Sequence, residues 1–382
     1  MELERQVELW KRARARGEDV YLATVVHVQG SSYRKPGARM LVTSSGERAG
    51  TISGGCLEAE VSRKIAWLTQ DGSYIQSYQS SFDDDNEGVP YGLGCGGTIW
   101  ILMETGESVH KVMAATQQAL DLRIASVTVA FLAPECRTVV VDTQHMEHSE
   151  IGSAEQLSDL IKESFSQGRV LAQSSDDPSL LPKALCIPIM PPPRLHVFGA
   201  GDDAQPIVRF AAELGWEVTV ADGRRHLLRQ ERFPEARHLE LIPFDDSDSS
   251  DAREISSELG VHDGDSVVIL THSYEQDRAI LKRLLAKPLH YLGILGPLQR
   301  TQRIINSISE YVGLSAEECL SRLHAPVGLS IGSGNPAVIA LAIVAEIQAE
   351  MEGVNVSVAR PGHLVRANSL SSSTFRSMVP IS

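Results

Sequence analysis

The stretch RLHVFGAGDDAQPIVRFAAELGWEVTVAD, residues 194–222, decides the fold class of the second half of the chain. RLHVF is short and apolar, as expected of a buried strand, and GAGDDA is a glycine-rich turn. AQPIVRFAAEL has apolar residues at helical spacing and is stopped by Gly215, after which EVTVAD forms the next strand. This order predicts the first βαβ unit of a Rossmann-like, doubly wound parallel sheet.

The glycine-rich turn is also a candidate nucleotide site. Three of its residues match the G-x-G-x-x-G/A fingerprint of dinucleotide-binding proteins: Gly199, Gly201 and Ala204. Asp222 ends the second strand, where an acidic side chain binds ribose hydroxyls. However, the carboxylates of Asp202 and Asp203 repel a pyrophosphate unless they turn away or a cation intervenes. One of them capping the helix is the structural alternative, so the sequence leaves NAD(P) binding open.

Three consecutive prolines, residues 191–193, mark a break in the chain. They can continue neither a helix nor a central strand. A length of 382 residues is also more than one hydrophobic core usually spans. We therefore expect a mixed α/β domain, a Rossmann-like domain and a flexible tail, over residues 1–189, 190–358 and 359–382.

Composition argues against several classes of protein. A hydrophobic fraction of 42% with 22% charged residues is typical of a globular protein. No apolar run approaches the roughly 20 residues of a membrane helix, and the N-terminus is charged rather than signal-like, which favours the cytoplasm and no membrane span. A net charge of -14 argues against nucleic-acid binding. Five scattered cysteines without a CxxC pair argue against a disulfide framework or a structural zinc site.

The most informative cysteine lies in TISGGCLEAE, residues 51–60. Ser53 is a suitable N-cap, and Gly54 and Gly55 allow a tight turn. This pattern predicts that Cys56 lies in the first turn of a helix, where unpaired amides and the helix dipole favour a thiolate. The alternative is a buried cysteine that only fills space.

Two further features point to a ligand near Cys56. Cys95 lies in a second glycine-rich run, GLGCGG, where small neighbours leave its sulfur accessible. The loop GSSYRKPGAR, residues 30–39, carries hydroxyls and bases that suit a phosphate: Ser31, Ser32, Arg34, Lys35 and Arg39. Together they favour a ligand with an anionic group and a soft centre, such as a metal or a sulfane sulfur. A solvated turn with three exposed bases is the alternative.

Five stretches in order, from about Val20 to Glu350, resemble motifs of the xanthine dehydrogenase accessory protein family, the XdhC and CoxI proteins. They are GSSYRKPGARMLV, GTISGGCLEAEV, GLGCGGTIWIL, LHVFGAGDDAQPIVRFAAELGWEVTVADGR and LHAPVGLSIGSGNPAVIALAIVAEI. Two details depart from the pattern. GAGDDA stands where the family often has GAGHVA, and GILGPLQR stands where a Ser-Arg-Arg run is common.

The resemblance implies a maturation factor rather than a turnover enzyme. Such a protein binds the molybdopterin cofactor, helps its molybdenum acquire a sulfido ligand from a cysteine desulfurase, and delivers it to a molybdenum hydroxylase apoenzyme such as xanthine dehydrogenase. In that family the cysteine of the SGGC motif, here Cys56, holds the cofactor. We expect Cys56 to meet the metal or its sulfur, Cys95 to line the same pocket, the basic loop to meet the phosphate, and the chain to form a homodimer.

Two other functions remain open from the sequence. One is a nicotinamide-dependent oxidoreductase that uses the Rossmann-like domain, with a reactive cysteine assisting. The other is a thiol redox sensor, which requires a disulfide between Cys56 and Cys95.

Overall fold

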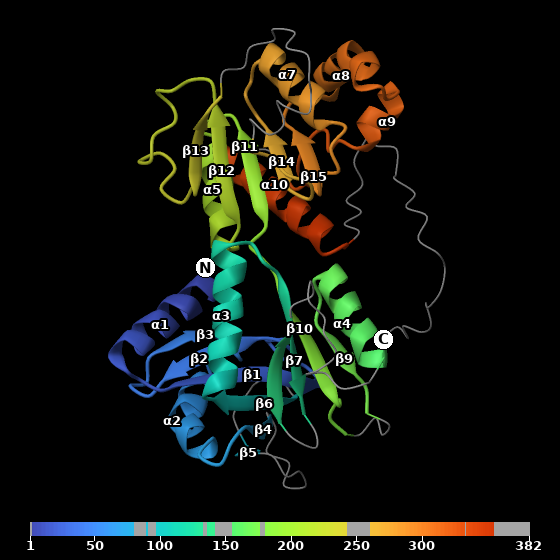
Figure 1. The fold of residues 1–382 in the computed structure, drawn as a ribbon. Coiled ribbons are helices and arrows are strands. Elements are labelled where there is room, and N and C mark those ends of the chain that lie inside the picture. The colour runs from blue at the N-terminus through green and yellow to red at the C-terminus, as the bar shows by residue number, and fades with distance from the viewer. Residues whose placement is uncertain are drawn as a thin grey trace, which may run out of the picture. The chain divides into compact units, whose positions relative to one another are not determined.

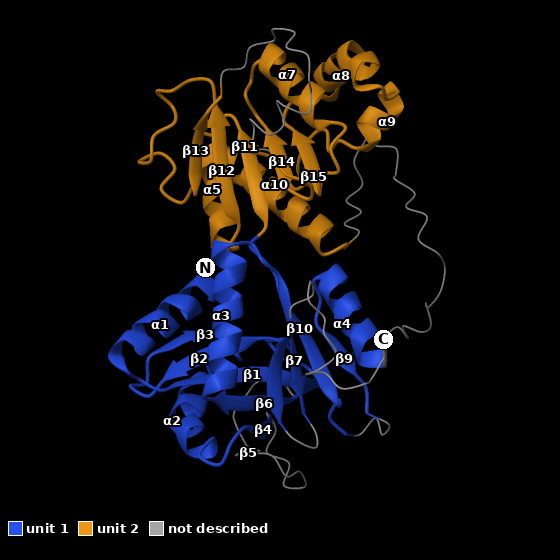
Figure 2. Ribbon diagram, viewed as in Figure 1, with its two compact units in different colours: residues 1–192 blue, residues 193–382 orange. Residues whose placement is uncertain are grey.

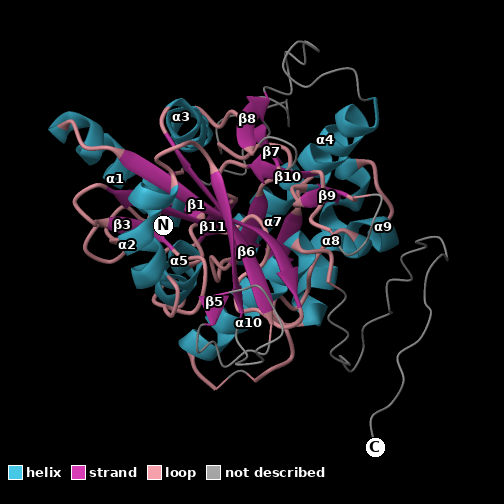
Figure 3. Cartoon of the chain, turned by 90° about the horizontal axis from the view of Figure 1, so that it is seen from below, coloured by secondary structure: helices cyan, strands magenta, loops and turns pink. Residues whose placement is uncertain are grey.

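The computed structural model describes residues 2–79, 89–90, 97–132, 136–141, 155–175, 180–242, 260–332 and 334–354. The chain divides into two compact units, residues 1–192 and 193–382 (Figure 2). Cys95 and the tail expected from residue 359 lie outside the described residues. Each unit combines strands with helices (Figure 3).

Unit 2 is built on a parallel five-stranded sheet (Figure 1). Its order is β13-β12-β11-β14-β15, and every neighbouring pair is parallel. The strands are β11 (Arg194–Phe198), β12 (Glu217–Asp222), β13 (His238–Leu241), β14 (Ser266–Ile269) and β15 (Tyr291–Ile294). This order reverses direction between β11 and β14, which is where Rossmann-like folds place their ligand crevice.

Helices cover both faces of this sheet. On β11, Leu195 and Val197 pack with one set of helices and Phe198 with the other, as the alternation of side chains along a strand requires. The first set is α5 (Ala204–Glu213) and α10 (Pro336–Met351); the second is α7 (Tyr274–Leu284), α8 (Leu298–Val312) and α9 (Ala316–Ser321). The predicted doubly wound sheet is therefore confirmed, with β11, α5 and β12 where the pattern placed them.

Unit 1 contains a mixed six-stranded sheet with the order β3-β2-β1-β6-β4-β5. Its strands are β1 (Val20–Gln29), β2 (Arg39–Thr43), β3 (Arg48–Gly50), β4 (Tyr74–Gln79), β5 (Val89–Pro90) and β6 (Thr98–Thr105). Strands β2 and β3 form an antiparallel hairpin whose turn contains Gly46 at a φ of 88°. All pairs except β4 with β5 are antiparallel.

A second sheet in unit 1, ordered β8-β7-β10-β9, packs against the first. Its strands are β7 (Ser126–Phe131), β8 (Arg137–Val141), β9 (Leu171–Gln173) and β10 (Ala184–Ile189). Val26 and Leu102 from the first sheet share one apolar cluster with Leu185 and Ile187 from the second. The helices of the unit are α1 (Glu2–Arg16), α2 (Glu58–Leu68), α3 (Glu107–Asp121) and α4 (Glu155–Gln167). Helices α1 and α3 cover one face of the six-stranded sheet, α2 covers the other, and α4 covers the smaller sheet.

Candidate functional site

The turn between β3 and α2 fixes the position of Cys56. The Ser53 hydroxyl accepts hydrogen bonds from the amides of Gly55, at 3.3 Å, and Leu57, at 3.1 Å. Gly55 has a φ of 106°, a conformation that favours glycine. Because this left-handed residue interrupts the helical path, α2 begins at Glu58. The prediction that Cys56 lies in the first turn, with Ser53 as N-cap, is therefore wrong: Cys56 precedes the helix.

The buried carboxylate of Glu58 stabilises this turn by accepting hydrogen bonds from it. Glu58 is 3% exposed, and its Oε1 accepts hydrogen bonds from the amides of Ile52, at 3.2 Å, and Ser53, at 2.9 Å. Its Oε2 accepts the Ser53 hydroxyl at 2.6 Å. Burial alone would raise the pKa of the Glu58 carboxyl, but these hydrogen bonds together hold it below its ordinary value. Glu58 is therefore an anion at neutral pH and fixes the turn that presents Cys56.

Cys56 is exposed and lines a cavity of about 110 Å³, here called the cysteine cavity. Three chain segments meet there: the loop after β1, the turn before α2 and the start of β6. The described lining residues are Ser31, Ser32, Tyr33, Ser53, Gly54, Cys56, Leu57, Gly97, Thr98 and Ile99. Three segments distant in sequence thus place a thiol and several hydroxyls around one small space.

The close packing of this cavity explains one of its glycines. A Cβ on Gly97 would lie 2.8 Å from the Gln29 carbonyl oxygen and 3.0 Å from the Ser31 amide. A side chain at this position would therefore push the serine loop away from β6. Tyr33 contributes a ring that is 74% exposed and that lies next to Gly54.

The structure brings together only some of the predicted site residues. Ser31, Ser32, Gly54 and Cys56 all line the cysteine cavity, whereas Gly55 forms the turn that supports it. Tyr33 and Thr98 were missed by sequence reasoning; Tyr33 lies between the predicted serines and bases, so its place in that loop was the available signal.

The three basic side chains of the loop, Arg34, Lys35 and Arg39, have different environments. Lys35 is exposed, and in the sequence it lies two residues after Tyr33, which lines the cysteine cavity. Arg34 forms an ion pair with Glu2 at 2.5 Å and donates to the Thr51 carbonyl at 3.1 Å. Arg39 lies on β2 and is only 8% exposed. Neither arginine lines the cysteine cavity; both line a separate cavity.

In unit 2 the glycine-rich turn connects β11 to the start of α5. Gly199 has a φ of 121°, and a Cβ there would collide with the Leu270 carbonyl. At Gly201 a Cβ would lie 2.5 Å from Oδ1 of Asp203. Ala204 is the first residue of α5 and is buried. Gly199 is therefore required for packing within the protein, whether or not a ligand binds, whereas a Cβ at Gly201 would meet only the end of the Asp203 side chain.

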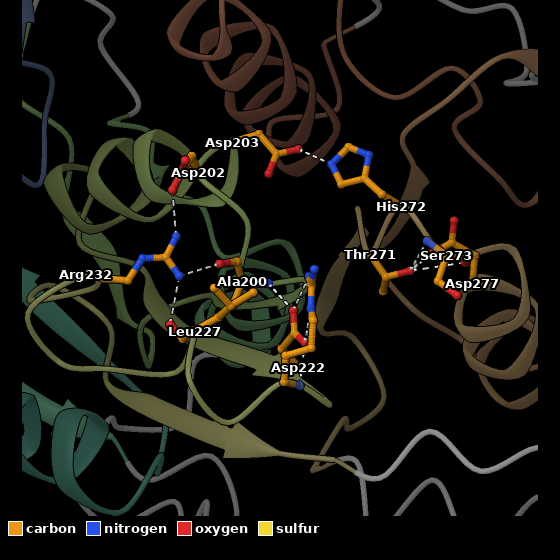
Figure 4. Close-up of polar contacts among 11 residues, drawn as sticks. Ala200, Asp202, Asp203, Asp222, Leu227, Arg232, Thr271, His272, Ser273 and Asp277 are labelled. Carbon is orange, nitrogen blue, oxygen red and sulfur yellow. Dashed lines mark hydrogen bonds and ion pairs between the residues drawn. The ribbon is translucent and has the colours of Figure 1, made fainter.

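Asp222 is turned into the protein rather than left free (Figure 4). It is 1% exposed, and its Oδ2 accepts the Ala200 amide at 2.7 Å. Arg224 donates to the same carboxylate through its amide, Nε and Nη2 at 2.8–3.0 Å. Burial alone would raise the pKa of the Asp222 carboxyl, but the bonds from Arg224 and Ala200 hold it below its ordinary value. A ribose hydroxyl would have to compete with these donors.

The two aspartates of the turn are also paired. Asp202 Oδ1 lies 2.7 Å from Arg232 Nη2, and Asp203 Oδ2 lies 2.7 Å from His272 Nε2 (Figure 4). His272 follows β14 and has a φ of 61°, which is uncommon for a residue other than glycine. The Asp203 carboxylate therefore lies toward the residues that follow β14. Asp203 holds the N-cap position of α5, but its side chain makes no capping hydrogen bond.

Within the described ranges, no three His, Cys, Asp or Glu side chains are grouped to hold a metal ion. No described helix is long and apolar enough to cross a membrane. Cys56 is therefore a single soft donor beside a cavity rather than part of a multidentate metal site in this portion of the chain.

Comparisons with known proteins identify relatives of both units. The family model described as the XdhC Rossmann domain matches residues 195–347, and the model of the XdhC and CoxI family matches residues 13–79. A Bacillus subtilis protein, named as a probable subunit of xanthine dehydrogenase, is 30% identical over 334 residues, covering 86% of this chain and 92% of the relative. The molybdenum cofactor insertion chaperone PaoD of Escherichia coli is 20% identical over 332 residues, covering 87% of this chain and 83% of the relative.

A solved structure agrees with these matches. It is a crystal structure from Bacillus halodurans described as a xanthine dehydrogenase, with a TM-score of 0.67 and 27% identity. The match covers 93% of this chain and 98% of that chain, so it includes both units.

Proposed function

Because this chain belongs to the XdhC and CoxI family, we propose that it is a maturation factor that binds a molybdenum cofactor and delivers it to a molybdenum hydroxylase. Two relatives support this reading by their names, one as a molybdenum cofactor insertion chaperone and one as a probable subunit of xanthine dehydrogenase. The cofactor is the cargo of such a protein, so the chain needs a site that holds it reversibly.

The exposed thiol of Cys56 in the cysteine cavity is the observation that carries this proposal. A thiolate is a soft ligand that suits a sulfur-bound transition metal. The hydroxyls of Ser31 and Ser32 offer hydrogen bonds to the polar edge of the same guest. The residues present therefore fit the metal-bearing end of the cofactor.

The size of the cavity supports binding of one end only. Pockets that enclose a drug-sized ligand have volumes of about 300–1,000 Å³, against about 110 Å³ here. Under this proposal the metal end contacts Cys56, while Lys35 and the Tyr33 ring at the exposed edge meet the rest of the molecule. We also propose that Cys95 lines this pocket.

The proposal has further parts concerning partners and location. The chain receives sulfur for the cofactor from a cysteine desulfurase, acts as a homodimer and works in the cytoplasm. We propose no NAD(P) site in unit 2, because the carboxylate of Asp222, the residue expected to bind the ribose, is buried and already bonded to Arg224 and to the Ala200 amide. Hydride transfer and a redox switch between Cys56 and Cys95 are therefore the outcomes to be tested against it.

The test is purification of the full chain from cells that make the cofactor, followed by measurement of molybdenum and pterin per protein. Losing an outer partner of a metal ligand typically costs 10–100-fold in affinity. Replacing the ligand itself, in Cys56→Ser, should therefore reduce bound molybdenum at least about tenfold. Cys136→Ser is the matched control, because Cys136 is half-buried and does not line the cysteine cavity.

Equal molybdenum in wild type and Cys56→Ser would remove Cys56 from the site. If neither preparation contains pterin and the purified protein binds NAD(P) and transfers hydride, the proposed maturation function is wrong and the protein is an oxidoreductase.

A further inference from the structure

Unit 1 contains a second, larger cavity of about 240 Å³, here called the arginine cavity. Its polar lining includes Glu2, Gln6, Arg34 and Arg39, and its apolar lining includes Leu3 and Met190. None of the described residues that line it also lines the cysteine cavity. It is therefore a distinct space with one charged side and one apolar side.

The charge of Arg39 is poorly compensated by the protein. Arg39 is 8% exposed; its Nη2 donates to the Thr128 hydroxyl, but its Nε has no hydrogen-bond partner among the residues described. Burial lowers the pKa of Arg39 to about 10. A buried ion costs several kcal/mol unless a counter-charge and hydrogen bonds compensate it. The guanidinium thus lacks much of the compensation that a buried cation normally has.

The buried carboxyl of Glu104 does not remove this deficit. Glu104 is 1% exposed; its Oε2 accepts the Thr138 hydroxyl at 2.7 Å, and its Oε1 has no partner in the described part of the chain. Burial raises the pKa of the Glu104 carboxyl despite the nearby Arg39. Glu104 therefore leaves Nε of Arg39 without a hydrogen-bond partner among the described residues, and an anion in the cavity would add to the charge compensation of the guanidinium.

Arg34 provides the second cation of the cavity. Its side chain is 29% exposed, and Nη2 lies 2.5 Å from Oε1 of Glu2, the first residue of α1. The Glu2 side chain is 43% exposed, so it can move into solvent. The Glu2 carboxylate thus occupies, from within the chain, a place at Arg34 that the anionic group of a ligand would take. A neighbouring polar atom, Oε1 of Gln6, is buried without a partner in the described ranges.

We propose that the arginine cavity binds a small organic anion, a carboxylate or a phosphate monoester, with its charge at Arg34 and Arg39 and an apolar body toward Leu3 and Met190. The anion displaces Glu2 from Arg34 when it binds. The site does not depend on the function proposed for Cys56, because the two cavities share no described lining residue.

Calorimetric titration of the full chain with defined probes tests this site. The probes are benzoate, phenyl phosphate, inorganic phosphate and the neutral analogue benzyl alcohol. We expect benzoate or phenyl phosphate to bind more tightly than inorganic phosphate, and benzyl alcohol not to bind. Tighter binding of phenyl phosphate identifies a phosphate monoester as the natural ligand class, and tighter binding of benzoate identifies a carboxylate.

Two substitutions at this cavity, at Arg34 and Glu2, have matched controls elsewhere in unit 1. Arg34→Gln should weaken binding at least about tenfold, because a charge-assisted hydrogen bond is lost. Arg12→Gln removes a similar guanidinium from the exposed pair with Glu47 and should not change it. Glu2→Gln should strengthen binding several-fold by removing the competing carboxylate, whereas Glu47→Gln should not.

The proposal fails if benzyl alcohol binds as well as benzoate, if Arg34→Gln and Arg12→Gln behave alike, or if neither organic anion binds at about 10 mM, a weak millimolar affinity. It also fails if Cys56→Ser weakens benzoate binding as much as Arg34→Gln, since the anion would then occupy the cysteine cavity. Unchanged benzoate binding in Cys56→Ser, together with lost molybdenum, supports both sites independently.

Discussion

The cysteine cavity in unit 1 and the glycine-rich turn in unit 2 use their polar side chains in opposite ways. Cys56 is an exposed free thiol beside a cavity. Near the turn, Asp202 and Asp222 each pair with an arginine, and Oδ2 of Asp203 lies 2.7 Å from Nε2 of His272. Asp222, which is 1% exposed, would have to give up its bonds to Arg224 and the Ala200 amide before it could bind a ligand, whereas the Cys56 sulfur has no such partner among the described residues. Equally clear sequence motifs therefore differ in what their residues are free to do.

Asp222→Ala should give the largest change in stability, because Asp222 is the most buried of these aspartates and its carboxylate accepts several hydrogen bonds. The substitution removes the acceptor for the Ala200 amide and for Arg224. Breaking a buried pair costs about 3–5 kcal/mol, and the partial exposure of Arg224 places this case near the lower limit, at about 3 kcal/mol. Urea denaturation followed by tryptophan fluorescence measures the loss in the free energy of unfolding.

The exposed Glu235→Ala is the control and should change the free energy of unfolding by less than about 0.5 kcal/mol. If Asp222→Ala is as mild as this control and instead abolishes binding of a nucleotide, Asp222 serves a ligand and the contrast between the two regions disappears.

Glu58→Gln tests whether the turn that presents Cys56 depends on a buried charge. The amide keeps the shape of the carboxylate but weakens its bonds to the Ser53 hydroxyl and to the amides of Ile52 and Ser53. We expect a loss of about 1 kcal/mol at pH 7. The exposed Glu107→Gln, at the start of α3, is the matched control.

The pH dependence of this loss has a definite sign. The pKa of the Glu58 carboxyl is lowered in the folded chain, so its stabilising effect is fully present above the unfolded value of about 4.3. The effect is lost as the pH falls through the lower, folded value. The difference in unfolding free energy between wild type and Glu58→Gln should therefore narrow below about pH 4.3. A difference that stays constant with pH would show that hydrogen-bond geometry alone matters.

Local sequence predicted the fold of unit 2 well, because its strands and helices follow simple periodicities. Apolar alternation placed β11 and β12, and Gly215, at a φ of 83°, ends α5 as expected. The start of α2 was missed because it depends on the left-handed Gly55 and on the bonds of Ser53, which the spacing of apolar residues does not record.

The site was predicted less completely because it depends on contacts between distant segments. Ser31 and Cys56, which the motifs grouped together, line one cavity, whereas Arg39, which the motifs placed in the same group, does not line it. Arg39 is drawn into the space between the two sheets by Thr128, which is 89 residues away in sequence. A loop motif carries no information about such a partner, so the separation into two cavities required the structure.

Of these substitutions, Cys56→Ser should have the smallest effect on stability, in contrast to Asp222→Ala. Cys56 is exposed and precedes α2, and no described residue forms a hydrogen bond with its sulfur. Replacing it should change the free energy of unfolding by less than about 0.5 kcal/mol, as is usual for surface positions. Urea denaturation of the same sample used for molybdenum analysis then separates the two roles. Lost molybdenum with unchanged stability is expected of a residue kept for a ligand, whereas a loss of stability like that of Asp222→Ala would make Cys56 part of the scaffold.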